Sequence, residues 1–268
     1  MAVIPRPSFL AFLLVLLVCG AQAQDVKSPP SRGRLISSID LSQPFGAKSG
    51  WRFMALQGPD TSEPVMMDSI PGKIQLCITR DGGVSCFPDL DRVLRLSSGD
   101  DGYSDPHYLI DARIVHPRAN RPLLFMQVGS EHSLDGDQRL ATVVLAYDQM
   151  RENFTVVYEK QTNKNNNQET RYIADGPLMG AIISAEPTGD APFGFWITVD
   201  RLGAAGRYKQ VLRYRSATRY GDGNPLRVID SEMPGILKRL SLWHPGDKLP
   251  LPPGECAKPR LIGQELWC

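Results

Sequence analysis

The chain has 268 residues, with 30 Lys and Arg residues against 29 Asp and Glu residues and a net charge of +1. This near-neutral balance excludes a globally basic nucleic-acid binder, so we expect no nucleic-acid partner. Apolar residues make up 42% of the chain, which is enough for a substantial hydrophobic core.

Residues 1–23 have the pattern of a cleaved signal peptide. Arg6 is the only charged residue in this segment, an apolar run FLAFLLVLLV follows it, and the tripeptide AQA ends just before Gln24. The apolar run is shorter than the roughly 20 residues that a permanent membrane helix needs. Modification of Cys19 as a lipoprotein is an alternative, but the bulky preceding valine disfavours it. We therefore expect a periplasmic or secreted protein without stable membrane insertion after cleavage.

The rest of the chain divides by composition into three parts. Residues 24–48 are rich in Pro, Ser and Gly and predict a flexible N-terminal arm. Residues 49–245 predict a β-rich globular domain. Residues 246–268 are rich in proline, which removes a backbone N–H and fixes φ, so we expect an extended tail closed by a disulfide.

Eight segments of the central part are rich in β-branched and aromatic residues and are bounded by Gly, Asn, Asp and Pro. They span residues 50–56, 73–79, 122–128, 141–148, 153–160, 181–186, 193–200 and 208–220. Their short spacing favours antiparallel pairing. The fold expected is all-β and mainly antiparallel, a β-sandwich or barrel-like body with a small β-propeller as the alternative. Two short helices are predicted, at 89–96 and 233–243, and the Asn-rich segment 161–170 predicts a mobile loop.

Four cysteines remain after signal cleavage, and an even number in an oxidising compartment predicts two disulfides. Cys77 and Cys86 flank an Asp-Gly-Gly turn, so a hairpin would place them opposite one another. Cys256 and Cys268 would then close a loop at the C-terminus. Free cysteines and a zinc site are the alternatives, and no C-x-x-C pair supports zinc.

Acidic, glycine-containing loops raise the question of calcium, which prefers several oxygen ligands on one flexible loop. Asp100, Asp101 and Asp105 lie in the best candidate, SSGDDGYSD. None of these loops follows the complete calcium-loop pattern, and ordinary Asx turns are the preferred explanation. We expect no cofactor, with calcium at these three aspartates as the alternative.

The sequence lacks the common catalytic signatures of nucleophilic, zinc-dependent and nucleotide-dependent enzymes. Its four histidines are far apart in the sequence. A carbohydrate-acting hydrolase would instead need two carboxylates about 5–10 Å apart in a groove. Candidate carboxylates on or near predicted strands are Glu152, Glu159, Glu169, Glu186 and Asp200.

The segment YKQVLRYRSATRY at 208–220 is the most distinctive stretch. If it forms one regular strand, alternate side chains point to opposite faces. One face would carry Tyr208, Gln210, Leu212, Tyr214, Ser216, Thr218 and Tyr220. The other would carry Lys209, Val211, Arg213, Arg215, Ala217 and Arg219. Six Lys or Arg residues and no acidic residue occur between residues 201 and 221.

Two interpretations of this segment compete. The tyrosines could face the core while the cations pair with carboxylates of neighbouring strands, with Asp200, Asp230 and Glu232 as the candidates; exposed pairs of this kind contribute only about 0–1 kcal/mol each. Alternatively, the guanidinium groups bind an anionic ligand, for which the planar donors of arginine are well suited. In that case the ligand-binding residues are Lys209, Arg213, Arg215 and Arg219.

Together these patterns predict an exported, non-catalytic binding or interaction protein of a bacterial periplasm or cell envelope. Its partner would be an anionic polysaccharide or an envelope protein. The first alternative is a secreted carbohydrate-acting hydrolase that uses acidic residues on the sheet. The second is an assembly factor of the cell envelope that makes contact through its arm and tail.

Overall fold

The computed structural model describes residues 33–48, 50–62, 69–86, 88–96, 103–191, 193–216, 218, 223–252, 254 and 256–268. The predicted signal peptide at 1–23 lies outside these ranges. Among the described residues, no helix has both the length and the apolar composition needed to cross a membrane.

Most of the described chain is β-strand, and all pairings between strands are antiparallel. The first sheet has the order β1-β2-β5, formed by Arg34–Asp40, Arg52–Gln57 and Ile74–Thr79. The central sheet has the order β6-β7-β8-β9, formed by Tyr108–Arg118, Arg121–Gly129, Leu140–Asp148 and Asn153–Gln161. The third sheet has the order β10-β11-β12-β13, formed by Glu169–Tyr172, Ile182–Pro187, Phe195–Leu202 and Tyr208–Arg215. Two small hairpins are β3-β4 (Thr61–Ser62, Ser69–Ile70) and β14-β15 (Arg260–Ile262, Glu265–Trp267).

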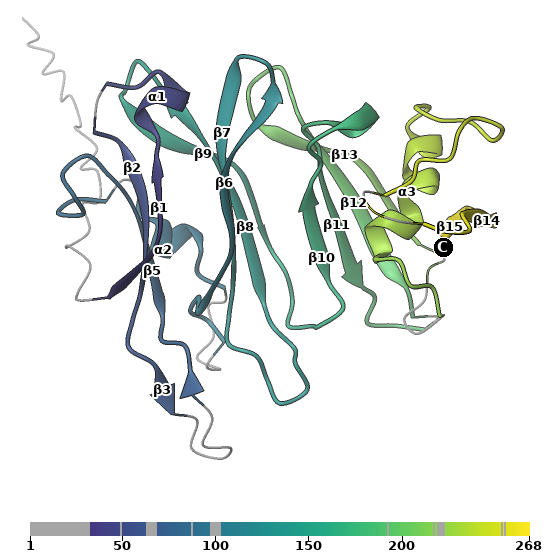
Figure 1. Cartoon of the computed structure of the whole chain (residues 1–268), viewed down its shortest axis with the longest axis horizontal. Coiled ribbons are helices and arrows are strands. Elements are labelled where there is room, and N and C mark those ends of the chain that lie inside the picture. Colours follow the sequence, from purple (N-terminus) through teal and green to yellow (C-terminus); the bar gives the residue numbers. More distant parts are fainter. Residues whose placement is uncertain are drawn as a thin grey trace, which may run out of the picture.

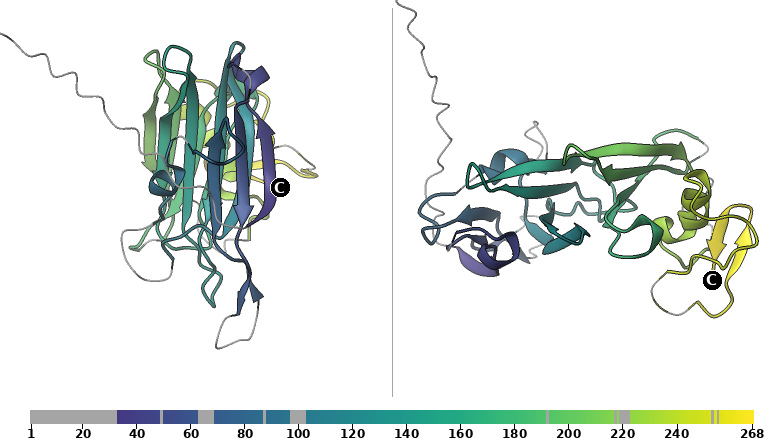
Figure 2. Two further views of the ribbon diagram at one scale, coloured as in Figure 1. Left: turned by 90° about the vertical axis from the view of Figure 1, so that its left-hand side faces the viewer. Right: turned by 90° about the horizontal axis from the view of Figure 1, so that it is seen from above.

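The three larger sheets lie side by side with their strands running in nearly the same direction (Figures 1 and 2). The all-β, antiparallel prediction is therefore confirmed, and the body is sandwich-like. It has three layers, and none of the sheets described closes into a barrel. Each four-stranded sheet is a meander, because its strands pair in sequence order.

The central sheet is buried on both faces. Leu124 and Met126 belong to the hydrophobic cluster shared with the first sheet, whereas Leu123 and Phe125 belong to the cluster shared with the third. Consecutive residues of β7 point to opposite faces, so both faces require apolar side chains. This explains the uninterrupted run PLLFMQV, which would be unusual in an antiparallel strand with one wet face.

The third sheet is covered on its outer face by helix α3 (Val228–Arg239). Ile197 and Val199 of β12 pack with Ile236 of α3 in one cluster. The intervening residue Thr198 points toward the central sheet instead, because side chains alternate along the strand. The face of β12 toward α3 is therefore apolar, and the face toward the central sheet carries polar side chains.

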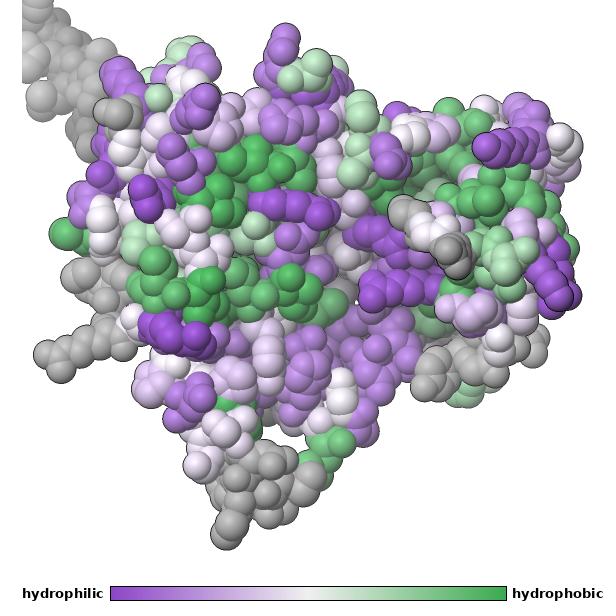
Figure 3. Space-filling view, viewed as in Figure 1, coloured by the Kyte–Doolittle hydropathy of each residue, from purple (hydrophilic) through white to green (hydrophobic). Residues whose placement is uncertain are grey.

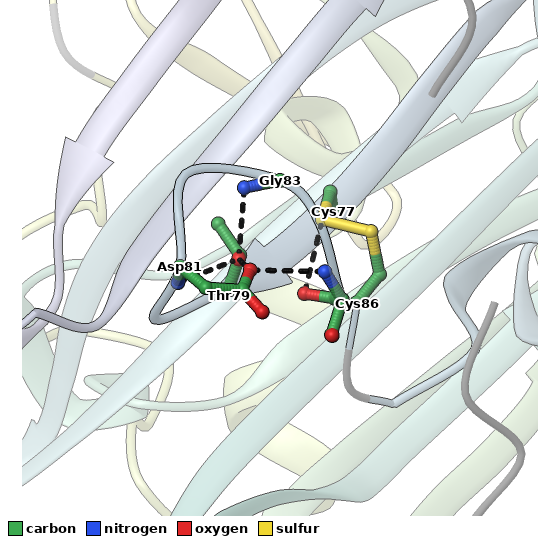
Figure 4. The surroundings of a disulfide bond; sticks show 6 residues. Cys77, Thr79, Asp81, Gly83 and Cys86 are labelled. Atoms are coloured by element: carbon green, nitrogen blue, oxygen red, sulfur yellow. Dashed lines mark hydrogen bonds between the residues drawn. A yellow bond between two sulfur atoms is a disulfide. The ribbon is translucent and has the colours of Figure 1, made fainter. Parts of the chain in front are cut away.

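Both disulfides are present with the predicted pairing. Cys77 and Cys86 have Cα atoms 5.0 Å apart, and Cys256 and Cys268 have Cα atoms 5.1 Å apart. Within the first loop, the Thr79 hydroxyl group accepts hydrogen bonds from the backbone N–H groups of Asp81 and Gly83 (Figure 4). The disulfides are compatible with a compartment outside the cytoplasm.

The expected N-terminal arm is ordered from Gly33 onward, which corrects the prediction. Residues Arg34–Asp40 form β1 at the edge of the first sheet, and Ser42–Phe45 form the short helix α1. Leu41 and Phe45 are buried in the core of this sheet. The composition was misleading because an edge strand can retain polar, exposed residues over most of its length.

The two predicted helices are present with different bounds. Helix α2 covers Leu90–Val93, inside the predicted segment 89–96. Helix α3 begins five residues before the predicted start, at Val228, and contains Pro234 in its interior. Proline within a helix is normally disfavoured, because it lacks the N–H that would bond to the preceding turn. The predicted segment 233–243 therefore missed the helical residues 228–232 before the proline, and it extended beyond the end of the helix at Arg239.

Candidate functional site

A bulge interrupts the strand that carries the predicted basic residues. Val199 pairs with Leu212 and Asp200 pairs with Gln210, so Val211 is an extra residue on β13. A bulge of this kind reverses which face the following side chains occupy. The regular two-face pattern predicted for 208–220 is therefore wrong, and the strand itself ends at Arg215.

The tyrosines confirm the reversal. Tyr208 packs between the third and central sheets, where its hydroxyl group donates to the carbonyl of Gly180. Tyr214 packs on the opposite face against α3, where its hydroxyl group donates to Glu232 at 2.6 Å. Burial, followed by the charge of Glu232, raises the pKa of Tyr214. These two residues therefore do not share a face as predicted, and Tyr220 lies outside the described residues.

The bulge also separates the predicted basic residues. Arg213 and Arg215 point toward the central sheet, because they are paired across the strands with Thr198 and Trp196, which face that way. Lys209 points toward the opposite face, since it lies between Tyr208 and Gln210 in the alternating pattern. Arg219 lies outside the described residues. The structure therefore brings two of the four predicted residues together and places a third on the other side of the sheet.

Arg215 is held by the protein itself. Its guanidinium group donates to the carbonyl oxygen of Asp190 at 2.8 Å and lies 3.5 Å from the carboxylate of the same residue. The Thr188 hydroxyl group also lies at 3.5 Å. These contacts anchor the loop between β11 and β12. Arg215 therefore stabilises the position of this loop.

Arg213 has different surroundings. Its guanidinium carbon lies 4.5 Å from the ring centroid of Trp196, which is cation–π geometry. No carboxylate within the described residues forms an ion pair with it. The carboxylates suggested from sequence are engaged elsewhere: Asp200 with Tyr158, Asp230 with Arg171, and Glu232 with Tyr214 and Thr218.

Arg213 and Trp196 line a cleft of about 450 Å³ between the central and third sheets. One wall is the Asn-rich loop between β9 and β10, which contributes Asn163, Asn165 and Gln168. Hydrogen bonds tie this loop to its neighbour, because the backbone N–H of Asn165 and the side-chain amide of Gln168 both donate to the Gln138 carbonyl. The cleft therefore combines an aromatic ring, a guanidinium group and several side-chain amides.

The opposite wall of the cleft contains Glu186, whose carboxylate pairs with Lys160 at 2.5 Å. The ammonium group of Lys160 also donates to the Ser184 hydroxyl oxygen at 2.7 Å. Ser184 is fully buried, so this Ser–Lys contact does not expose a nucleophile to the cleft. Lys160 therefore neutralises the carboxylate of Glu186, whereas neither Arg213 nor Lys164 forms an ion pair within the described part of the chain.

Behind Lys160 lies Asp200, which is 9% exposed and accepts a hydrogen bond from the Tyr158 hydroxyl group at 3.3 Å. Burial raises the pKa of Asp200, against the opposing effect of the nearby Lys160 charge. Burial and the neighbouring Asp200 raise the pKa of Tyr158. Polar side chains thus continue from the cleft into the layer between the two sheets.

Of the five carboxylates considered for hydrolysis, Glu186 and Asp200 are close enough to influence one another. Glu152, in the β8–β9 turn, is paired with Lys48 and Arg80. Glu169 is bound to Arg171, and Glu159 is exposed on β9. The structure thus gathers two of these carboxylates beside the cleft, and both are already engaged by Lys160 or Tyr158.

Arg171 on β10 forms ion pairs with two mostly buried carboxylates. Its guanidinium group donates to Glu169 at 3.0 Å and to Asp230 of α3 at 2.6 Å. Burial acts to lower the pKa of Arg171, but hydrogen bonds and charge from Asp230 and Glu169 raise it above its ordinary value. Glu169 also accepts a hydrogen bond from the Ile229 N–H near the start of α3. The network joins the helix to the sheet.

The calcium prediction is only partly covered by the described residues. Asp100 and Asp101 lie outside them, while Asp105 forms an ion pair with Lys73. Within the described ranges, no group of three or more His, Cys, Asp or Glu side chains is placed to hold a metal ion.

Sequence reasoning identified Arg213 but missed the other residues of the cleft. Trp196 belongs to a predicted strand, but only the pairing of β12 with β13 shows that Arg213 lies over its ring. The loop residues Asn163, Asn165 and Gln168 were expected to be mobile. A useful signal was their amide-rich composition, which suits a hydrogen-bonding wall as well as a loop. Comparisons with protein families, with curated proteins and with solved structures find no match to this chain.

Proposed function

We propose that this is an exported, non-catalytic binding protein of a bacterial periplasm or cell envelope, and that it recognises an acidic carbohydrate in the cleft of Arg213. The observation that carries the proposal is the setting of Arg213, which rests on Trp196 without a carboxylate partner among the described residues. A guanidinium group can bind a carboxylate through two parallel hydrogen bonds.

The other cleft residues suit a sugar with several hydroxyl groups. Side-chain amides such as those of Asn163 and Gln168 both donate and accept hydrogen bonds. The indole ring of Trp196 offers an apolar surface beside them. Lys164, whose ammonium group lies 4.6 Å from the Tyr103 ring, adds positive charge at the rim. A uronic-acid unit presents one carboxylate and several hydroxyl groups and so matches this set.

The test is a titration of the mature protein with a short galacturonate oligomer, followed by calorimetry and by tryptophan fluorescence. Arg213→Ala should weaken binding by at least about tenfold, because a charge-assisted hydrogen bond is worth roughly 1.5–3 kcal/mol. Lys209→Ala is the matched control: it removes the same charge from the same strand, but on the opposite face. Binding that is unaffected by Arg213→Ala would reject this site.

The hydrolase alternative has weaker support. In both inverting and retaining glycosidases, the two catalytic carboxyl groups must reach the bond that is cleaved. Glu186 lines the cleft, but Asp200 lies behind it and is largely buried. Incubating the same oligomer with the protein and measuring newly formed reducing ends separates the two functions. If the wild type forms new reducing ends and Glu186→Gln does not, the result supports hydrolysis over binding alone.

A further inference from the structure

The central and third sheets bring four turns to one end of the molecule, opposite the cleft of Arg213. These are the turns β6–β7, β8–β9, β10–β11 and β12–β13, at the top of Figure 1. Arg118 at the end of β6 donates to the carbonyl of Leu202 at the end of β12, at 3.1 Å. A Cβ atom on Gly180, in the β10–β11 turn, would lie 2.7 Å from Pro117 of β6. These contacts show that the turns of both sheets are packed together.

This end carries more cations than carboxylates, and we call it the arginine end. It comprises Arg118, Arg121, Arg151, Arg201, Arg207 and Lys209. Its carboxylates are Asp148 and Glu152, which are paired with cations, and the exposed Asp175 in the β10–β11 turn. Arg151 lies 3.8 Å from Asp148. No described carboxylate forms an ion pair with Arg118, Arg121 or Arg207. Arg201 and Lys209 are paired directly across two strands, where like charges are destabilising. In Figure 3, hydrophilic side chains occur along this upper edge among pale green, more apolar ones.

Backbone groups hold these arginines in place. Arg207 donates to the carbonyl of Val156 at 3.2 Å, and Arg118 donates to that of Leu202. Arg121 lies against Gly206, where an added Cβ atom would come 2.1 Å from a guanidinium nitrogen. A carbonyl oxygen orients a guanidinium group without neutralising its charge. The positive groups are therefore positioned in advance, and their charge remains for an external anion.

Between the turns lies an open hollow of about 830 Å³, lined by Arg121, Arg151 and Arg207. Met150 also lines it and stands at the tip of the β8–β9 turn, where it is 95% exposed. Met179, in the β10–β11 turn at the same end, is 48% exposed. Large apolar side chains at turn tips, with guanidinium groups around them, match the boundary between lipid headgroups and acyl chains.

We infer that the arginine end docks on an anionic lipid bilayer. Lipid phosphate groups enter the hollow and contact Arg121 and Arg207, while Met150 reaches the acyl boundary. Each Lys or Arg near such a surface contributes about 1 kcal/mol. The exposed Met150 favours a lipid bilayer over a soluble polyanion, because a sulfated or carboxylated polymer offers no apolar phase for this side chain. This inference does not depend on the function proposed for the cleft.

The test is co-sedimentation of the mature protein with vesicles of phosphatidylcholine, either pure or enriched in phosphatidylglycerol. We expect binding to the anionic vesicles that weakens as salt is added. The double variant Arg121→Gln, Arg207→Gln should bind about 30-fold more weakly, from two contributions of about 1 kcal/mol each. The matched control is the double variant Lys164→Gln, Arg213→Gln, which removes the same charge at the opposite end. It should leave vesicle binding unchanged.

Two further variants sharpen the test. Met150→Ser keeps the charge and changes a fully exposed position, so the fold is preserved; it should weaken vesicle binding by roughly tenfold. Gly206→Ala should displace Arg121 and weaken vesicle binding without removing a charge. Because Gly206 has a φ of +78°, this variant also strains the turn, so its unfolding by urea is measured beside its vesicle binding. Equal binding to both kinds of vesicle overturns the inference. A second result also overturns it: Met150→Ser binds vesicles as strongly as the wild type, and dextran sulfate displaces the protein completely. That result assigns the surface to a soluble polyanion.

Discussion

Arg171 and Arg213 lie on the two edge strands of the same sheet, yet they have opposite surroundings. Arg171 is enclosed between Glu169 and Asp230 and links the sheet to α3. Arg213 rests on an aromatic ring and borders a cleft. The partners of an arginine, rather than its place in a basic stretch of sequence, therefore determine whether it stabilises the fold or is available to a ligand.

The largest effect should come from breaking the enclosed network. Arg171→Ala leaves two mostly buried carboxylates without their cation, and removing one partner of a buried ion pair costs about 3 kcal/mol. The free energy of unfolding, measured with urea, should fall by about that amount. Arg213→Ala should change it by less than about 1 kcal/mol, as is usual for an exposed side chain. Equal losses for the two variants would contradict the comparison.

A second prediction concerns the buried carboxylate behind the cleft. The pKa of Asp200 is raised by burial, so the folded state favours the protonated form. The contribution of this group to stability is present at low pH and is lost as pH rises through its folded pKa. Asp200→Asn should therefore raise the free energy of unfolding at pH 7, measured with urea.

At a pH below the ordinary pKa of an aspartate, wild type and Asp200→Asn should be equally stable, because Asp200 is then protonated in both the folded and unfolded states. A destabilised Asp200→Asn variant at pH 7 would show that the charge of Lys160 outweighs burial at this position. Glu159→Gln, which changes an exposed carboxylate on β9, serves as the control for a general charge effect.

A small effect on stability is expected at Arg215, whose surroundings are intermediate between those of the two compared arginines. It is held by Asp190, whose carboxylate is largely exposed, so Arg215→Ala should cost only about 0.5 kcal/mol. Its effect on galacturonate binding should be smaller than that of Arg213→Ala, because its donors are occupied by the loop. A loss of binding larger than that of Arg213→Ala would move the site toward the β11–β12 loop.

Local patterns predicted eight strands and both disulfides, but they missed β1, β6 and β10 of the three larger sheets. The run around Leu124 was apolar enough to identify β7, and the turn between Cys77 and Cys86 indicated their pairing. Pairing between distant strands was not accessible from one sequence. The bulge at Val211 depends on the register between β12 and β13, so the faces of the basic residues could not be deduced correctly.

The same limit applies to the sites. The cleft depends on a loop that lies about 50 residues before Arg213 in the sequence. The arginine end depends on Arg121 meeting Gly206, which is 85 residues later. No local spacing connects such residues. The amide-rich loop and the exposed Met150 were visible in the sequence, but their significance depends on the neighbours that the fold provides.

The most direct test of the difference between Arg171 and Arg213 follows the side-chain Nε–H resonances of both by NMR during a galacturonate titration. The variants Arg171→Lys and Arg213→Lys assign the two signals. The Arg213 resonance should shift in a saturable manner while that of Arg171 stays in place, because its donors are already bonded to Glu169 and Asp230. An unchanged Arg213 resonance at saturating ligand would contradict the proposed role of this arginine.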